Sequence, residues 1–267
     1  MTNEMNYYKT IIQYDGTSYY GFQWQKDVPT VQNDLNQALR QLIVGKITTM
    51  GASRTDSGVH ALSQAVKISS EQKIDCEMAL IRLNTILPPQ IRCLSFESCD
   101  GSFKPSVDSR SKEYYYFFTN RLQSLEADQL FLANNPHPLN IGLMEKCIQL
   151  FVGTHNFQNF YSVGSNVKST VRDIFSCELS VVNPHSVLNG AALFKIPDNL
   201  VECYRFRIEG NGFLKQMIRH LISALWMVGR GRISPEEFSL LLTGPKREEQ
   251  LWKPAPAKGL YLSRIEY

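Results

Sequence analysis

The stretch from Met50 to Val66, MGASRTDSGVHALSQAV, contains a single carboxylate, Asp56, which follows Arg54 by two residues. The residues beside this pair are small, so a large planar ligand could approach the Asp56 side chain. An ionised carboxylate with such access can attack as a nucleophile or remove a proton as a general base. An alternative interpretation is a turn-forming aspartate, whose side chain hydrogen-bonds the backbone two residues further on.

A second group of candidate residues lies in the sequence FLKQMIRHLISALWMVG, which predicts an amphipathic helix over residues 213–229. We expect Lys215, Arg219 and Trp226 to share one stripe of this helix. The stripe leads to Arg230 and Arg232 in the sequence GRGR, and together they predict a basic and aromatic surface suited to phosphates and bases. The alternative for Arg219 is an ordinary exposed position on the helix.

The run EYYYFF predicts a strand, because aromatic residues favour pleated surfaces. Side chains alternate across a strand, so Tyr114 and Tyr116 share one face and Tyr115 lies on the other. One face can then stack on a base while the other fills the core. A purely structural role for all three tyrosines is the alternative.

Patterns that would indicate other chemistry are incomplete. The sequence GNGFLK follows a predicted strand and opens a predicted helix, as a dinucleotide-binding loop would, but it lacks the third glycine of that motif. Residues 109–112 match the S-x-x-K of acyl-transfer serines without the accompanying K-T-G or S-D-N. The five histidines include no H-E-x-x-H and the six cysteines no C-x-x-C, so no metal site is predicted.

Composition predicts a globular protein, because 43% of the 267 residues are hydrophobic and 20% are charged. The formal net charge of +3 permits a polyanionic partner without requiring one. The longest apolar stretch, LISALWMV, is too short to span a bilayer, and the opening residues lack the basic and apolar regions of a signal peptide. We therefore expect a cytoplasmic protein without membrane contact.

Hydrophobic periodicity predicts strands and helices that alternate along the chain. Thr30 is the expected N-cap and Gly45 the expected terminator of the first helix, and Ser234 is expected to form a capping box with Glu237. Several strands look amphipathic, which favours an α+β fold with antiparallel sheets. The expected strands lie near residues 7–15, 61–69, 112–120, 204–210 and 259–267, and the expected helices near residues 30–45, 75–87, 141–153, 213–229 and 235–244.

A series of motifs spanning nearly the whole chain resembles the tRNA pseudouridine synthase A family. RTDSGVHA is a specific signature of that family. The accompanying motifs are YDGTSYYGFQWQ, TVQNDLNQAL, LNTILP, SKEYYY, GNGFLKQMIRHL, VGRGRISPEEF and PAKGLYL. The resemblance implies isomerisation of uridine to pseudouridine in the anticodon stem-loop of tRNA, with tRNA as the partner and without a cofactor or metal.

The resemblance also implies roles for individual residues. The catalytic aspartate of the family corresponds to Asp56, its active-site tyrosine to Tyr114, and the arginine that pairs ionically with the aspartate to Arg219. Arg54 corresponds to the arginine that takes the place of the flipped-out base. Further substrate contacts are expected from Lys215, Arg230 and Arg232.

The fold implied by the resemblance is α+β, with two similar halves that each contain an antiparallel sheet flanked by helices, an active cleft between them, and a homodimeric assembly. We expect residues 1–110 to carry the catalytic aspartate loop and residues 111–267 to carry the tyrosine strand and the arginine helix. Lys104, Pro105 and Ser106 replace the His-Ala-Arg usual in the family, which predicts a lost or relocated RNA contact. Two rival interpretations remain open: an RNA-binding paralogue with lost or narrowed activity, and a nucleotide-cofactor enzyme built on GNGFLK.

Overall fold

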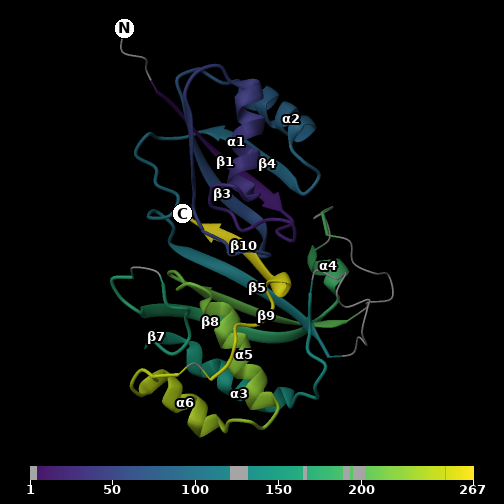
Figure 1. The fold of residues 1–267 in the computed structure, drawn as a ribbon, viewed down its shortest axis with the longest axis vertical. Coiled ribbons are helices and arrows are strands. Elements are labelled where there is room, and N and C mark those ends of the chain that lie inside the picture. The colour runs from purple at the N-terminus through teal and green to yellow at the C-terminus, as the bar shows by residue number, and fades with distance from the viewer. Residues whose placement is uncertain (1–4, 121–131, 165–166, 189–192, 195–201, 250) are drawn as a thin grey trace. The chain divides into compact units, whose positions relative to one another are not determined.

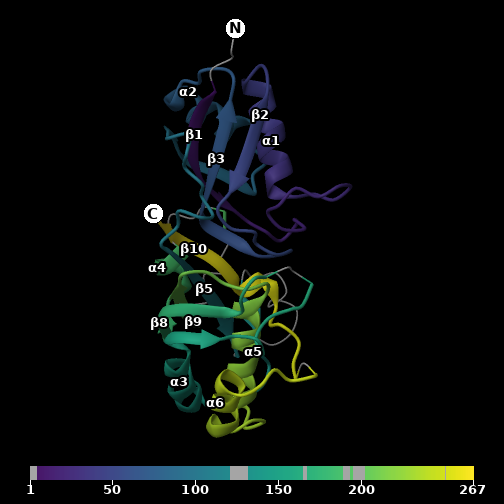
Figure 2. The ribbon, with the colours of Figure 1, turned by 90° about the vertical axis from the view of Figure 1, so that its left-hand side faces the viewer.

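The chain folds into two compact units in the computed structural model, which describes residues 5–120, 132–164, 167–188, 193–194, 202–249 and 251–267 (Figures 1 and 2). Unit 1 consists of the described residues of Met1–Arg110, Gly190–Phe194 and Tyr261–Tyr267. Unit 2 consists of those of Ser111–Asn189 and Lys195–Leu260. Each unit contains both strands and helices.

Unit 1 is built on a sheet with the strand order β4-β1-β3-β10, and β2 also pairs with β3. β1 is antiparallel to β3 and β4, and β2 is antiparallel to β3, whereas β10 is parallel to β3. Helices α1 and α2 contact each other and pack on β2 and β4, respectively. The bounds are β1 (Asn6–Tyr14), α1 (Val31–Leu42), β2 (Ile47–Gly51), β3 (His60–Ser70), α2 (Cys76–Ile86), β4 (Ile91–Ser98) and β10 (Leu260–Glu266).

Capping residues explain where the first helix begins, but its end differs from the prediction. The Thr30 side chain accepts a hydrogen bond from the Asn33 N–H and caps α1, as predicted. The helix ends at Leu42, three residues before the expected terminator Gly45. Ile43 already has extended backbone angles and a buried side chain, so the left-handed turn at Gly45, with φ +97°, belongs to the following loop.

Unit 2 is built on a sheet with the strand order β5-β9-β8-β7, and β6 also pairs with β5. Neighbours along this order are antiparallel, whereas β6 is parallel to β5. Helices α3, α5 and α6 pack on one another. The bounds are β5 (Ser111–Thr119), β6 (Ala133–Asn134), α3 (Ile141–Ile148), η2 (Gln149–Phe151), β7 (Gly153–Asn156), β8 (Val171–Val182), α4 (Pro184–Leu188), β9 (Cys203–Gly210), α5 (Met217–Gly229), α6 (Pro235–Thr243) and η3 (Ala257–Gly259).

One face of the unit 2 sheet is an aromatic core. Phe206 and Ile208 of β9 are fully buried there, as the alternation of that strand predicts. Tyr116 of β5 is also fully buried and lies edge-on against Trp226 of α5, with ring centroids 6.1 Å apart. This packing fixes β5 and α5 relative to each other within the unit.

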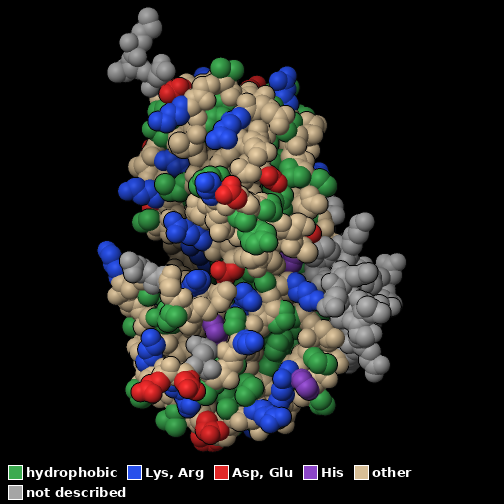
Figure 3. Space-filling model, in the orientation of Figure 1, with side chains coloured by type: hydrophobic (Ala, Val, Ile, Leu, Met, Phe, Trp, Pro, Cys, Tyr) green, Lys and Arg blue, Asp and Glu red, His purple; other side chains and the backbone are tan. Residues whose placement is uncertain are grey.

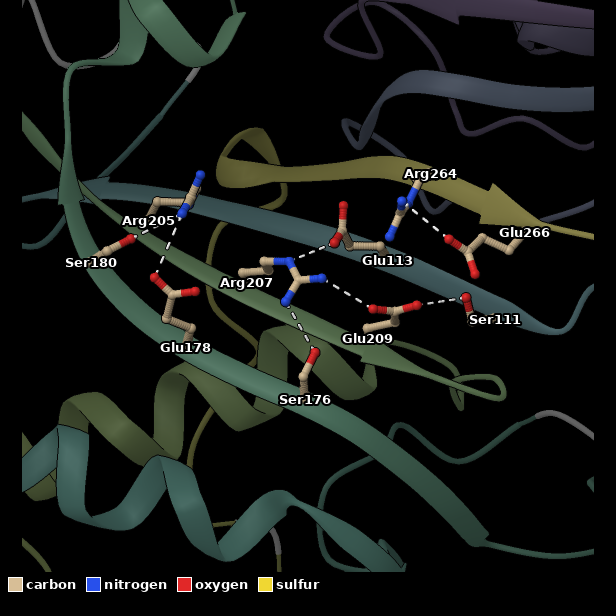
Figure 4. Close-up of polar contacts among 10 residues, drawn as sticks. All are labelled: Ser111, Glu113, Ser176, Glu178, Ser180, Arg205, Arg207, Glu209, Arg264 and Glu266. Atoms are coloured by element: carbon tan, nitrogen blue, oxygen red, sulfur yellow. Dashed lines mark hydrogen bonds and ion pairs between the residues drawn. The ribbon is translucent and has the colours of Figure 1, made fainter.

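The opposite face of the same sheet carries a network of charged side chains (Figure 4). Arg207 of β9 donates from Nε to Glu113 at 2.5 Å, from Nη2 to Glu209 at 3.0 Å and from Nη1 to Ser176 at 3.0 Å. Ser111 Oγ donates to the second oxygen of Glu209 at 2.7 Å. The network joins β5, β9 and β8, so it holds the register of β5 in the residues just before Tyr114.

The α+β prediction with mostly antiparallel strands is confirmed in both units. The capping box of α6 is present as expected, because Ser234 accepts from the Glu237 N–H and the Glu237 carboxylate accepts from the Ser234 N–H. None of the helices in the described parts of the chain is long and apolar enough to cross a membrane.

Candidate functional site

The loop between β2 and β3, residues 52–59, is called the Asp loop here and contains Arg54 and Asp56. Arg54 is exposed and Asp56 is half-buried, while Thr55 between them is buried. The loop has no regular secondary structure apart from the turn at Ser57 and Gly58. Its conformation therefore depends on contacts with other segments.

The segment at residues 14–22, which starts with the last residue of β1, holds the Asp loop in place. The Tyr14 hydroxyl and the Thr55 hydroxyl form a buried hydrogen bond of 2.7 Å. The Phe22 N–H donates to the Thr55 carbonyl at 3.1 Å, and the Gly58 N–H donates to the Tyr19 carbonyl at 3.2 Å. These contacts fix the backbone on both sides of Asp56.

Two glycines allow this close approach. A Cβ atom on Gly16 would lie 2.0 Å from the Val59 carbonyl oxygen. A Cβ on Gly21 would lie 2.6 Å from the Thr55 carbonyl oxygen, and Gly21 has φ +100°, which favours glycine. Side chains at either position would force the two segments apart.

Gln64 of β3 fixes the other end of the Asp loop. This side chain is fully buried and accepts from the Ser53 N–H at 3.1 Å while donating to the Ser53 carbonyl at 2.5 Å. Both backbone groups of Ser53 are thereby satisfied by one amide, as a pair of strand hydrogen bonds would do.

His60 and Asp15 tie the start of β3 to the end of β1. His60 is fully buried, and its Nδ1 lies 3.2 Å from Asp15 Oδ1 and 3.1 Å from the Gly16 backbone nitrogen. Burial acts to raise the pKa of the Asp15 carboxyl, but hydrogen bonds with His60 and Thr17 outweigh it and hold that pKa below its ordinary value.

Tyr114 lies in the middle of β5, opposite Ile208 of β9, and its side chain is buried on the face that also carries Tyr116. Its ring contacts Phe213 edge-on, with centroids 5.2 Å apart. Tyr115 lies on the other face, where Arg205 stands over its ring at 5.2 Å. The predicted alternation of the three tyrosines is therefore correct.

Arg219 lies in the first turn of α5 and is half-buried rather than exposed. Its Nε donates to the Ala255 carbonyl at 2.6 Å, and the Ala255 N–H donates to the Arg219 carbonyl at 3.1 Å. The chain before β10 thus holds both the backbone and the side chain of Arg219.

A chain of hydrogen bonds fixes the residue that follows Arg219. The Ser162 hydroxyl donates to Gln216 Oε1 at 2.6 Å and lies 2.9 Å from His220 Nε2, which makes this nitrogen the donor. His220 is 2% exposed. Burial, with a smaller contribution from the Arg219 charge, lowers the pKa of His220 to about 4, so the imidazole is neutral at physiological pH.

The remaining basic candidates do not share one helical stripe. α5 begins at Met217, because Gln216 adopts a left-handed backbone with φ 57°, so Lys215 precedes the helix and is exposed. Trp226 is 8% exposed and packs in the core, which contradicts the predicted basic and aromatic surface. Arg230 is half-buried and donates from Nη2 to Asn135.

Arg232 is exposed on the turn before α6. Lysine and arginine side chains are spread over the visible face of the molecule (Figure 3). Of the seven predicted site residues, Arg54 and Asp56 belong to unit 1, and the rest belong to unit 2. The structure brings Arg54 and Asp56 into one loop. In unit 2, Tyr114 lies on β5 and Arg219 on α5, and the other three residues lie in the segments that flank α5.

Sequence reasoning missed the residues that position the Asp loop, namely Tyr14, Gly21, Thr55 and Gln64. The expected strand at residues 7–15 ends within the motif YDGTSYYGFQWQ, and nothing in that motif indicates a partner 41 positions away, the separation of Tyr14 and Thr55.

Removing the Tyr14 hydroxyl should destabilise unit 1. In Tyr14→Phe the buried Thr55 hydroxyl loses its partner, so we expect the free energy of unfolding to fall by about 1–3 kcal/mol. Urea unfolding measures this. The double variant Tyr14→Phe/Thr55→Val removes both hydroxyls and should recover part of the loss; a double variant as unstable as the sum of the single ones would contradict the proposed contact.

Acidification should destabilise the fold through His220. Above pH 6.5, the ordinary pKa, the residue is neutral in both states; below it, the unfolded chain takes up a proton that the folded protein accepts only near pH 4. Between pH 7.5 and 5 this costs about 2 kcal/mol. We expect His220→Gln to lose less stability over this range than the wild type. Equal pH dependence in the two proteins would be the contrary result.

Comparisons with known proteins agree with the motifs. A family model described as tRNA pseudouridine synthase matches residues 147–267. The tRNA pseudouridine synthase A 2 of Desulfotalea psychrophila is 37% identical over 273 residues, which cover 98% of this chain and 99% of that protein. The tRNA pseudouridine synthase A of Clostridium acetobutylicum is 33% identical over 259 residues, which cover 97% and 98%.

Among solved structures, the crystal structure of a Cbf5-Nop10-Gar1 complex matches 80% of this chain and 44% of that chain with 10% identity and a TM-score of 0.30, too low for an argument. The two sequence relatives do support a family assignment, because each is more than 30% identical to this protein along nearly the whole chain. The chain therefore belongs to the tRNA pseudouridine synthase A family, a family of isomerases.

Proposed function

We propose that this protein isomerises uridine to pseudouridine in the anticodon stem-loop of tRNA, with Asp56 as the catalytic group. The observation that carries the proposal is the nearly full-length similarity to proteins named tRNA pseudouridine synthase A, such as the relatives that are 37% and 33% identical. Support comes from the Asp loop, whose sequence matches the family signature and whose backbone is fixed on both sides of Asp56.

The reaction breaks the C1′–N1 bond of uridine, turns the uracil, forms a C5–C1′ bond and removes the proton from C5, while the freed N1 gains a proton, so that substrate and product are isomers. No net oxidation occurs, so the balance needs no oxidant or reductant. The Asp56 carboxylate can enter as a nucleophile or as a base that removes a sugar proton. In either role it must be ionised, and its half-buried position keeps it accessible.

We assign supporting roles to residues of unit 2. Arg219 pairs with the carboxylate of Asp56 and keeps it charged, since a cation within about 4–6 Å lowers a carboxyl pKa by about 1–3 units. Tyr114 stacks on the detached base and can transfer a proton. The hydrogen bonds that Ala255 makes with Arg219 restrict the arginine to few conformations, which suits a positioning role.

RNA binding is assigned to basic residues. The target base lies in a helical stem, so flipping it out costs a few kcal/mol, and the exposed Arg54 can fill the vacated place. Lys215 and Arg232 are exposed and available for phosphates, whereas Arg230 already uses one amine on Asn135. We therefore propose a smaller phosphate contribution from Arg230 than from the other two.

The proposal includes tRNA as the partner, a homodimeric assembly and a cytoplasmic location. It also divides the chain functionally, with residues 1–110 supplying the Asp loop and residues 111–267 supplying Tyr114 and Arg219. A second candidate function is an RNA-binding paralogue with lost or narrowed activity. The observation that favours it is the replacement of the usual His-Ala-Arg by Lys104, Pro105 and Ser106.

The deciding variant is Asp56→Asn, which is nearly isosteric but has no nucleophilic or basic oxygen at neutral pH. Because phosphate contacts supply most of the affinity, tRNA binding should weaken by no more than about tenfold, roughly 1.4 kcal/mol. Pseudouridine formation on unmodified tRNA should vanish, as measured by nucleoside analysis after incubation with the purified full chain.

Asp75→Asn is the matched control, because Asp75 is the N-cap of α2 and asparagine caps helices equally well. This variant should keep normal activity. Thermal unfolding excludes a folding defect in Asp56→Asn. Pseudouridine formation at a tenth of the normal rate in folded Asp56→Asn would remove Asp56 from the essential role. Binding without any isomerisation by the wild type would favour the paralogue.

A further inference from the structure

Two large aromatic side chains are exposed on the loop between β1 and α1. Tyr20 is 57% exposed and Trp24 is 54% exposed. Among the large hydrophobic side chains exposed in the described regions, Phe175 is the other aromatic one. Tryptophan is highly buried on average, so an indole held in water is an informative observation.

The backbone beneath these rings is fixed by hydrogen bonds. The Tyr20 N–H donates to the Pro29 carbonyl at 2.9 Å, and the Gln25 side chain donates to the Tyr20 carbonyl at 2.8 Å. The Trp24 N–H donates to Gln32 Oε1 at 2.9 Å. The rings are therefore presented by an ordered backbone, which lowers the entropy cost of binding a partner.

The same loop is bonded directly to the Asp loop. Tyr19, which precedes Tyr20, accepts the hydrogen bond from Gly58, and Phe22 donates to Thr55. Trp24 follows Phe22 by two residues, so their Cα atoms lie within about 7 Å of each other. The two exposed rings therefore belong to a segment that is bonded to the Asp loop on both sides of Asp56, within reach of an RNA strand that delivers a base to Asp56.

We propose that Tyr20 and Trp24 form a stacking platform for unpaired bases of the tRNA, next to the base that reaches Asp56. This rests on the proposed function. Bases stack on aromatic side chains regardless of sequence, because every base has a π-face. An anticodon stem-loop supplies unpaired bases beside its stem. Lys26 and Asp27 follow Trp24 and cancel in charge, which favours stacking over phosphate binding at this loop.

Tryptophan fluorescence of the full chain, titrated with unmodified tRNA, tests the platform. The other tryptophans are the core residue Trp226 and the half-buried Trp252, so stacking on Trp24 should dominate the quenching. Trp24→Phe should lose most of this signal yet bind nearly normally. Trp24→Ala and Tyr20→Ala should each weaken tRNA binding by about 5- to 100-fold with an unchanged salt slope.

Phe175→Ala, in which an equally exposed aromatic of β8 is removed, is the matched control and should bind tRNA normally. Unchanged affinity in both Trp24→Ala and Tyr20→Ala would overturn the proposal. So would a Trp24 signal that changes with protein concentration without RNA, because the rings would then face a second copy of the chain. Tryptophan fluorescence and tRNA affinity are measured without turnover. A wild type that binds tRNA through Tyr20 and Trp24 but does not isomerise uridine would therefore refute the proposed function and leave the stacking platform standing.

Discussion

The contact between the segment at residues 14–22 and the Asp loop is the constraint on which the rest of the candidate site depends. Ordering the backbone of an irregular loop costs about 1–2 kcal/mol per residue, and the Asp loop has no ladder of its own to offset that cost. The Tyr14–Thr55 hydroxyl pair and the backbone bonds from Phe22 and Gly58 supply the missing partners. Asp56 gains a fixed backbone while its side chain keeps access to solvent.

In unit 2 the candidate residues are positioned by regular secondary structure, with Tyr114 on β5 and Arg219 on α5. Tyr114 is fixed because β5 is held on one face by aromatic packing and on the other by the Arg207 network (Figure 4). Arg219 is fixed because Ala255 bonds both its backbone and its guanidinium. Each proposed catalytic group therefore has a backbone held in place by its neighbours, which is what a preorganised site requires.

Local signals predicted much of the fold and less of the site. The strand containing Tyr114, the cap at Thr30 and the capping box at Ser234 followed from nearby residues and are confirmed. The family was also predicted correctly, from RTDSGVHA and its companion motifs. Lys215 and Trp226 were misplaced, because periodicity extended the helix past the left-handed Gln216 and did not distinguish an aromatic surface from an aromatic core. The clamp on the Asp loop joins residues far apart in sequence, so no local pattern could reveal it.

The most direct test of the account is a map of pseudouridine in tRNA from cells that lack this gene and from the same cells carrying the wild-type gene or its Asp56→Asn variant. If Asp56 is the catalytic group, pseudouridine disappears from anticodon stem-loops when the gene is removed and returns with the wild-type gene alone. An unchanged map after removal of the gene, or equal restoration by Asp56→Asn, would contradict it.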